Sequence, residues 1–99
     1  MKRTERHQAK TLLGEFSRPL GNETLTVRVY RDHGSCVCER EVVERDGTSF
    51  TMVIPFREVH TLKAVLSADP HYANVSADVV RVLGKVDRAL RIGNADPET

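Results

Sequence analysis

Apolar and polar residues alternate along three successive runs of this sequence, and two short turns join the runs. In the first run, Leu25, Val27 and Val29 alternate with Thr26 and Arg28. This is the period of a half-buried β-strand. The runs cover residues 25–31, 36–44 and 49–54, and the turns are His33-Gly34 and Arg45-Asp46-Gly47. A chain with this pattern is expected to form an antiparallel sheet with one buried face.

The first turn sets the register of the first two runs. If His33-Gly34 is a two-residue loop, Asp32 pairs with Ser35. The ladder then opposes Val29 to Cys38, Val27 to Arg40 and Leu25 to Val42. One face of this hairpin is therefore apolar except at Arg40.

The second turn has two possible registers, and they differ in which side chains they bury. A three-residue loop with Gly47 at positive φ pairs Glu44 with Thr48 and keeps the same face apolar. A two-residue loop would oppose Glu41 to Met52 and bury carboxylates. Because a one-residue slip moves every side chain to the other face, we predict the three-residue loop.

Two charged residues of this ladder stand out. Arg40 falls on the apolar face, where it either extends its guanidinium to solvent at the sheet edge or has a function. On the opposite face, Arg28 lies across from Glu39, an opposite-charge pair. That second face mixes charged and β-branched residues, so we expect it to be half exposed.

The N-terminal part of the chain gives weaker signals. Residues 1–10 are expected to form a flexible basic arm, and residues 1–20 carry five Lys and Arg against two Glu. The run 11–17 is interrupted by Gly14 and predicts a bent edge strand. Residues 18–24 contain turn formers and predict a loop.

Two amphipathic helices are predicted after the strands. The first covers residues 56–68, and the second is capped by Ser76 and ends near Gly93. The fold class is therefore α+β, a small antiparallel sheet of three to four strands followed by two helices. We expect one domain over residues 11–93 and a disordered acidic tail over 94–99. The first helix covers the apolar face, so the second lies on the outer valines or packs against another subunit.

No catalytic or metal-binding motif is present. Cys36 and Cys38 alternate into the apolar face, and no further ligands have zinc-like spacing, so we expect reduced, buried, metal-free thiols. Glu39 and Glu41 share a strand face, where carboxylates are usually solvated. We therefore expect neither an enzyme nor a cofactor or small-molecule substrate.

The sequence also bears on localisation. No apolar run reaches the ~18 residues that a membrane span needs, and the start MKRTERHQAK lacks the apolar core of a secretory signal. The expectation is a cytoplasmic protein that does not enter a membrane.

Four residues have the chemistry of a nucleic-acid surface: Lys10, Arg18, Arg28 and Tyr30. Cations bind phosphates and an aromatic ring stacks on bases. A second basic group, Arg81, Lys85 and Arg88, recurs at helical spacing, but helices commonly expose such a face.

The segments LLGEFSRPL, LTVRVYRD, EREVVERDG and FTMVIPFREVHTLKAVL resemble the single-stranded-DNA-binding fold of transcriptional positive cofactor 4, which is related in architecture to the Whirly proteins. The likeness covers residues 11–68. It implies a curved antiparallel sheet, a homodimer formed through the helix, and nucleic acid bound along the sheet by Arg28, Tyr30 and Arg18. The Lys- and Gly-rich segment that precedes the family's last strand is absent here.

Two functions follow from the sequence. The first is a small non-enzymatic domain that binds single-stranded DNA or RNA along its sheet, as a possible homodimer. The alternative is a protein-interaction or dimerisation domain without nucleic-acid binding. The net charge of +1 favours the alternative, and the resemblance favours the first.

Overall fold

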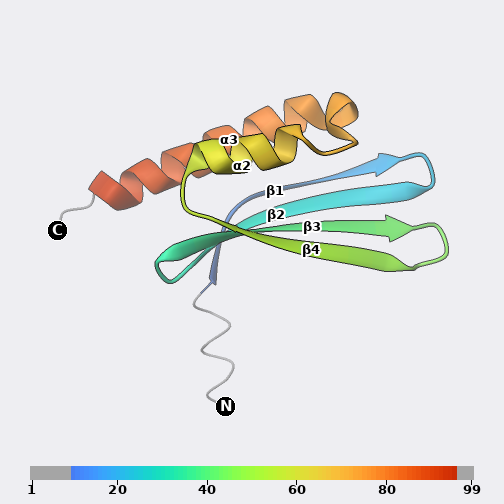
Figure 1. The fold of residues 1–99 in the computed structure, drawn as a ribbon, viewed down its shortest axis with the longest axis horizontal. Helices are drawn as coiled ribbons and strands as arrows, with labels where there is room; N and C mark the ends of the chain where they lie inside the picture. The colour runs from blue at the N-terminus through green and yellow to red at the C-terminus, as the bar shows by residue number, and fades with distance from the viewer. Residues whose placement is uncertain (1–9, 96–99) are drawn as a thin grey trace, which may run out of the picture.

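The computed structural model describes residues 10–95, with side chains as far as Arg91. Four antiparallel strands in the order β1-β2-β3-β4 are followed by two helices (Figure 1). The elements are β1 Lys10–Leu20, β2 Glu23–Asp32, β3 Ser35–Glu44, β4 Ser49–Phe56, α2 Val59–Ser67 and α3 Tyr72–Ala95. The predicted α+β class is therefore confirmed. The predicted arm, apart from Lys10, and residues 96–99 of the predicted tail lie outside the described residues.

Both predicted registers are confirmed. In the first hairpin Asp32 pairs with Ser35, and Val27 opposes Arg40. In the second, Gly47 has φ +93°, and the amide of Glu44 donates to the carbonyl oxygen of Thr48 at 2.7 Å. Glycine suits this turn because positive φ carries no Cβ clash.

The first strand is longer than predicted. It begins at Lys10 and continues through residues 18–20, which we expected in a loop. The turn is limited to Gly21 and Asn22, with Gly21 at φ +65°. A register shift between Leu12 and Gly14 marks a β-bulge, so the predicted bend of this edge strand is present.

The helices also differ from their predicted bounds. Phe56 is buried as the last residue of β4, so α2 begins only at Val59. The loop expected before Ser76 is helical, because α3 starts at Tyr72 and is interrupted only at Val75, which has φ −129° and ψ 16°. None of the helices in the described part of the chain is long and apolar enough to cross a membrane.

Both helices cover the same face of the sheet, which corrects our placement of the second helix (Figure 1). We expected α2 alone to cover this face. In the structure, α3 packs over β1, and α2 packs beside α3. We call this the helix face and the uncovered side the open face. One core joins the sheet to both helices: Phe16, Leu25, Val27, Val29, Cys36, Cys38, Val42, Phe56, Leu62, Leu66, Val75, Val79, Val82 and Val86.

Two ion pairs attach the helical layer to the sheet. Arg40 does not extend to solvent; its Nη2 donates to Oδ1 of Asp69 at 3.1 Å, and its Nε also binds this carboxylate. Asp69 lies in the α2–α3 connection and also accepts the amide of His71 at 2.9 Å. Arg18 on β1 binds both carboxylate oxygens of buried Asp78 on α3, at 2.8–3.0 Å.

Removing one partner of the Arg40–Asp69 pair should strongly destabilise the fold, because the side chains are only 18% and 6% exposed. Burial acts to raise the pKa of Asp69, but hydrogen bonds from Arg40 and from the His71 amide outweigh it and the pKa is lowered. We expect Arg40→Met to lower the free energy of unfolding by about 3 kcal/mol, since it leaves a buried carboxylate unpaired.

Urea unfolding measures this effect, and Asp69→Asn added to Arg40→Met is the control. The amide retains an oxygen for the His71 amide but removes the charge, so the double variant should recover part of the loss. A single variant as stable as the wild type contradicts the assignment.

Candidate interaction surfaces

The open face gathers three of the four predicted nucleic-acid residues. Lys10, Arg28 and Tyr30 lie on neighbouring positions of β1 and β2, because Lys10 pairs with Asp32 and Leu12 with Tyr30. The Nζ of Lys10 lies 5.0 Å from the centroid of the Tyr30 ring, a cation–π contact. This part of the face therefore offers a cation and a ring side by side.

Carboxylates on the same face neutralise these cations. Nε of Arg28 lies 3.6 Å from Glu15 and its Nη1 lies 3.8 Å from Glu41. Nζ of Lys10 lies 3.8 Å from Glu39. The predicted opposition of Arg28 and Glu39 across the ladder is confirmed, but Arg28 forms its ion pairs with Glu15 and Glu41. Phosphates approaching this face would meet three carboxylates around two cations, which weakens electrostatic attraction.

Arg18 does not join this group. Its strand position pairs with Leu25, which places it on the helix face, where it binds Asp78. The sequence placed Arg18 in a loop, where its side chain had no fixed direction. The structure therefore divides the four predicted residues between the two faces.

The basic group on α3 is also partly neutralised. Arg81 binds Asp78, and Arg91 lies 3.0 Å from Asp87. Lys85 and Arg88 are exposed between them. This arrangement is typical of a solvated helix surface, as the sequence suggested.

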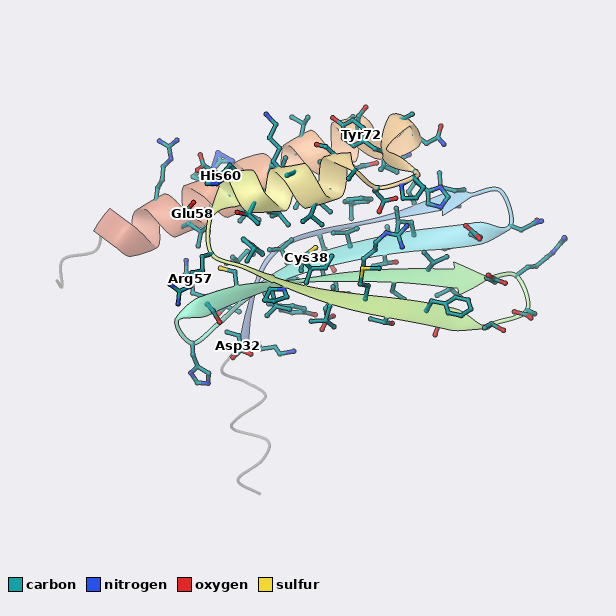
Figure 2. The ribbon with its side chains drawn as sticks, in the orientation of Figure 1. Asp32, Cys38, Arg57, Glu58, His60 and Tyr72 are labelled. Atoms are coloured by element: carbon teal, nitrogen blue, oxygen red, sulfur yellow. The ribbon has the colours of Figure 1, made fainter. Side chains whose placement is uncertain are left out.

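The two cysteines are buried and unbonded, as predicted. Cys38 lies between the sheet and the helices (Figure 2). Burial, the largest cause, acts with the charge of Glu39 to raise the pKa of its thiol to about 11, although Arg40 offsets part of the effect. Burial also raises the pKa of Cys36. In the part of the chain that the structure describes, no three His, Cys, Asp or Glu side chains gather as a metal site.

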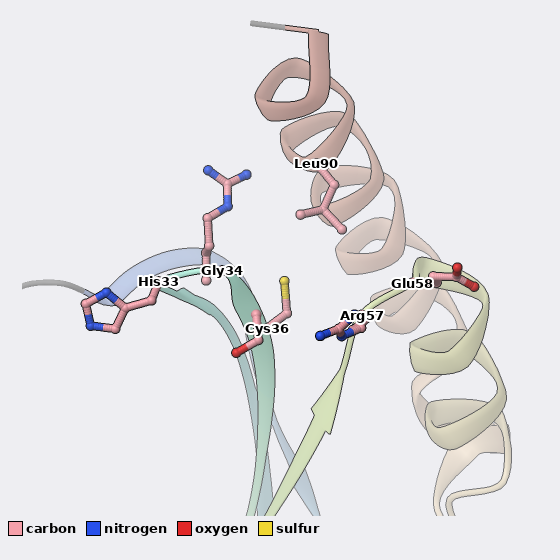
Figure 3. A pocket seen from close by; sticks show the side chains of 8 residues that line it. His33, Gly34, Cys36, Arg57, Glu58 and Leu90 are labelled. Atoms are coloured by element: carbon pink, nitrogen blue, oxygen red, sulfur yellow. The ribbon is translucent and has the colours of Figure 1, made fainter. Parts of the chain in front are cut away.

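A polar hollow of about 550 Å³ lies where the β2–β3 turn approaches the start of α2. Arg31, Cys36, Arg57 and Glu58 line it, whereas the His33 ring points away (Figure 3). Nη2 of Arg31 donates to the carbonyl oxygen of Ala89 at 3.0 Å. The raised pKa of Cys36 disfavours the thiolate form that a nucleophile needs. The Cys36 thiol of this hollow is therefore not activated for nucleophilic attack.

The surface that the sequence analysis missed is β4. Residues 49–53 are all exposed, with Phe50 at 59%, Met52 at 54% and Val53 at 57%. The predicted three-residue turn places Phe50 and Met52 on the apolar face, and they do lie there, but the helices leave them exposed. The absence of any charged residue from Ser49 to Phe56 was the available signal.

Comparison of the chain with protein-family models, with curated proteins and with solved structures finds no match.

The thiols generate a pH prediction. A folded pKa raised from 9.0 to about 11 means that the folded state holds a proton which the unfolded state releases. Stability is therefore complete below pH 9 and falls as pH rises towards 11, by about 1.4 kcal/mol per pH unit for Cys38. The difference in unfolding free energy between wild type and Cys38→Ala, measured by urea titration from pH 8 to 11, should shrink over this window.

Thiol-labelling kinetics provide a second readout. Both cysteines should react slowly in native buffer at pH 7.5 and fast in urea. Rapid labelling of Cys38 without denaturant would contradict its burial.

Proposed function

We propose that this chain is a non-catalytic protein-interaction domain that adds an extended polypeptide segment to its sheet along β4. The observation that carries the proposal is the uncharged and exposed edge formed by β4. An edge strand presents a row of unpaired backbone groups, and recognition domains use such edges to bind a further strand.

The other edge of the sheet is protected in the ways that proteins usually protect edges. β1 contains a bulge between Leu12 and Gly14, charged side chains and Pro19, and α3 packs against it. These features disfavour pairing with another chain. Of these protective features, β4 has only the proline, Pro55, which lies near the end of the strand. The contrast within one sheet supports a role for β4.

The phase of the ladder identifies the free backbone groups. The amide of Glu44 donates to Thr48, so residues in phase with Thr48, such as Phe50 and Met52, direct their backbone groups towards β3. Ser49, Thr51 and Val53 therefore direct theirs away from the sheet. Pro55 has the same phase, so its missing N–H removes no bond to β3.

An apolar hollow adjoins this edge on the helix face. It has a volume of about 280 Å³ and lies beside the exposed Met52. Its other lining residues come from β3, β4, the end of α2 and the α2–α3 connection: Arg40, Ile54, Val65, Leu66, Ala68, Asp69 and Pro70. An added strand would place alternate side chains over Phe50, Met52 and this hollow.

Selection from a displayed library of random peptides tests strand addition. We expect the recovered peptides to alternate apolar residues and to bind the wild-type chain. Thr51→Pro should weaken binding about tenfold, because it removes one outward N–H worth about 1 kcal/mol and adds a ring at the edge.

The controls separate binding from folding. Thr51→Pro should leave the melting temperature nearly unchanged, whereas Met52→Pro should lower it, because only Met52 donates towards β3. Val80→Lys, at an equally exposed apolar position on α3, should bind peptides like wild type. Recovery of no alternating peptide by a monomeric chain, or equal binding by Thr51→Pro, overturns the proposal.

Nucleic-acid binding along the open face is the second candidate function. It is supported by the placement of Lys10, Arg28 and Tyr30 on one uncovered surface of the sheet. The neighbouring Glu15, Glu39 and Glu41 make it the weaker candidate.

Two substitutions test this candidate in a fluorescence titration with labelled single-stranded oligonucleotides. Arg28→Ala should lower the salt slope by about one, because one phosphate contact is lost. Tyr30→Ala should weaken binding by ~1–3 kcal/mol with little change in slope, because stacking is lost. If no oligonucleotide binds at low salt and about 100 μM protein, where non-specific binding normally appears, this function is excluded.

A further inference from the structure

We propose that the segment bound along β4 is the β4 strand of a second copy of this chain, paired antiparallel about a two-fold axis centred on Thr51. The inference rests on the proposed strand-binding function and names its partner. The two four-stranded sheets would join into one continuous eight-stranded sheet.

The register follows from the free backbone groups. A two-fold axis at Thr51 pairs Thr51 with its own copy and Ser49 with Val53. These are the three residues of β4 whose N–H and C=O point outward, so each free amide of the strand acquires an acceptor. Pro55, which has no N–H to donate, lies beyond the paired segment.

The neighbouring symmetric registers pair fewer of the outward backbone groups of β4. With the axis at Met52, Ser49 faces Pro55, and the proline nitrogen cannot donate. With the axis at Phe50, Val53 faces Gly47, which is in the turn at φ +93° and outside the strand. The Thr51 register is therefore the one that satisfies Ser49, Thr51 and Val53 together.

The side chains match in the same register. On the helix face, Phe50 of each copy lies across from Met52 of the other, so the exposed apolar side chains of β4 cover one another. Cross-strand pairs of an aromatic and an apolar side chain stabilise a sheet. On the open face, the Thr51 side chains meet at the axis and each Val53 lies beside a Ser49.

Charge permits this symmetric contact. In a two-fold interface the same patch is used twice, so a charge near the axis approaches its own copy and repels it. The strand from Ser49 to Phe56 contains no charged residue. β1 could not pair in this way, because it carries Lys10, Glu15 and Arg18. The β4 edge is suited to bind an uncharged strand with alternating apolar residues. A second copy of β4 is such a strand.

Sedimentation velocity and cysteine cross-linking test the inference on the full chain. Wild type should sediment as a dimer at micromolar concentration, and Thr51→Pro as a folded monomer whose far-UV circular dichroism spectrum matches that of wild type. Met52→Lys, which places a charge in the symmetric contact, should also sediment as a monomer. Val80→Lys and Leu12→Lys alter exposed apolar side chains elsewhere and should remain dimeric.

Cross-linking reads the register directly. Residues directly opposite in a hydrogen-bonded antiparallel pair have Cα atoms about 5.5 Å apart, within the reach of a disulfide. Under mild oxidation Thr51→Cys should therefore form a covalent dimer. Ser49→Cys and Val53→Cys, tested separately, should not, because each introduced thiol lies opposite the other position. Cys36 and Cys38 are buried and serve as a constant background.

The outcomes distinguish this inference from the proposed function. A dimer that cross-links through Thr51→Cys supports the inference. Cross-linking through Phe50→Cys or Met52→Cys in its place overturns the register. A wild-type monomer that binds alternating peptides overturns self-pairing and leaves strand addition standing, whereas a monomer that binds none overturns both.

Discussion

The phase of the β3–β4 ladder, fixed by the Gly47 turn, determines what this sheet can do. Cys38 and Val42 of β3 lie with the core on the helix face, and because the Glu44 amide bonds to Thr48, Phe50 and Met52 of β4 share that face. The same phase sends the backbone groups of Thr51 outward, so one turn sets both the face that each β4 side chain occupies and the free edge. A shift of one residue would exchange all these roles.

Charges as well as apolar side chains hold the helical layer on the sheet. Asp78 on α3 binds Arg18 at one edge, and Asp69 between the helices binds Arg40 near the middle of the sheet. These pairs direct α3 towards β1 and hold the α2–α3 connection over β3. The consequence is that Phe50 and Met52, at the far edge, are left uncovered although they continue the buried face.

The sheet could be predicted from the sequence because strand parity and turn length leave one register that buries no carboxylate, and the Gly47 turn confirms this reasoning. The placement of the second helix could not. Its stripe, which includes Val79 and Val86, shows that α3 is buried on one side but not which surface covers it. Nothing in the sequence near Asp78 indicates that Arg18 reaches it from sixty residues away. Tertiary ion pairs of this kind carry no periodic signal.

The helices leave two surfaces uncovered, the open face and the β4 edge. These surfaces differ in how many of their charged and hydrogen-bonding groups already have partners within the chain. On the open face, Arg28 has two carboxylates nearby and Lys10 has Glu39 and the Tyr30 ring, so a polyanion must displace internal ion pairs to bind. Along β4, which is the last strand of the sheet, the outward amides of Ser49, Thr51 and Val53 have no strand beside them among residues 10–95. A partner strand gains hydrogen bonds and covers apolar surface without displacing an intramolecular contact. This asymmetry favours the proposed association at the edge of the sheet over binding on the open face.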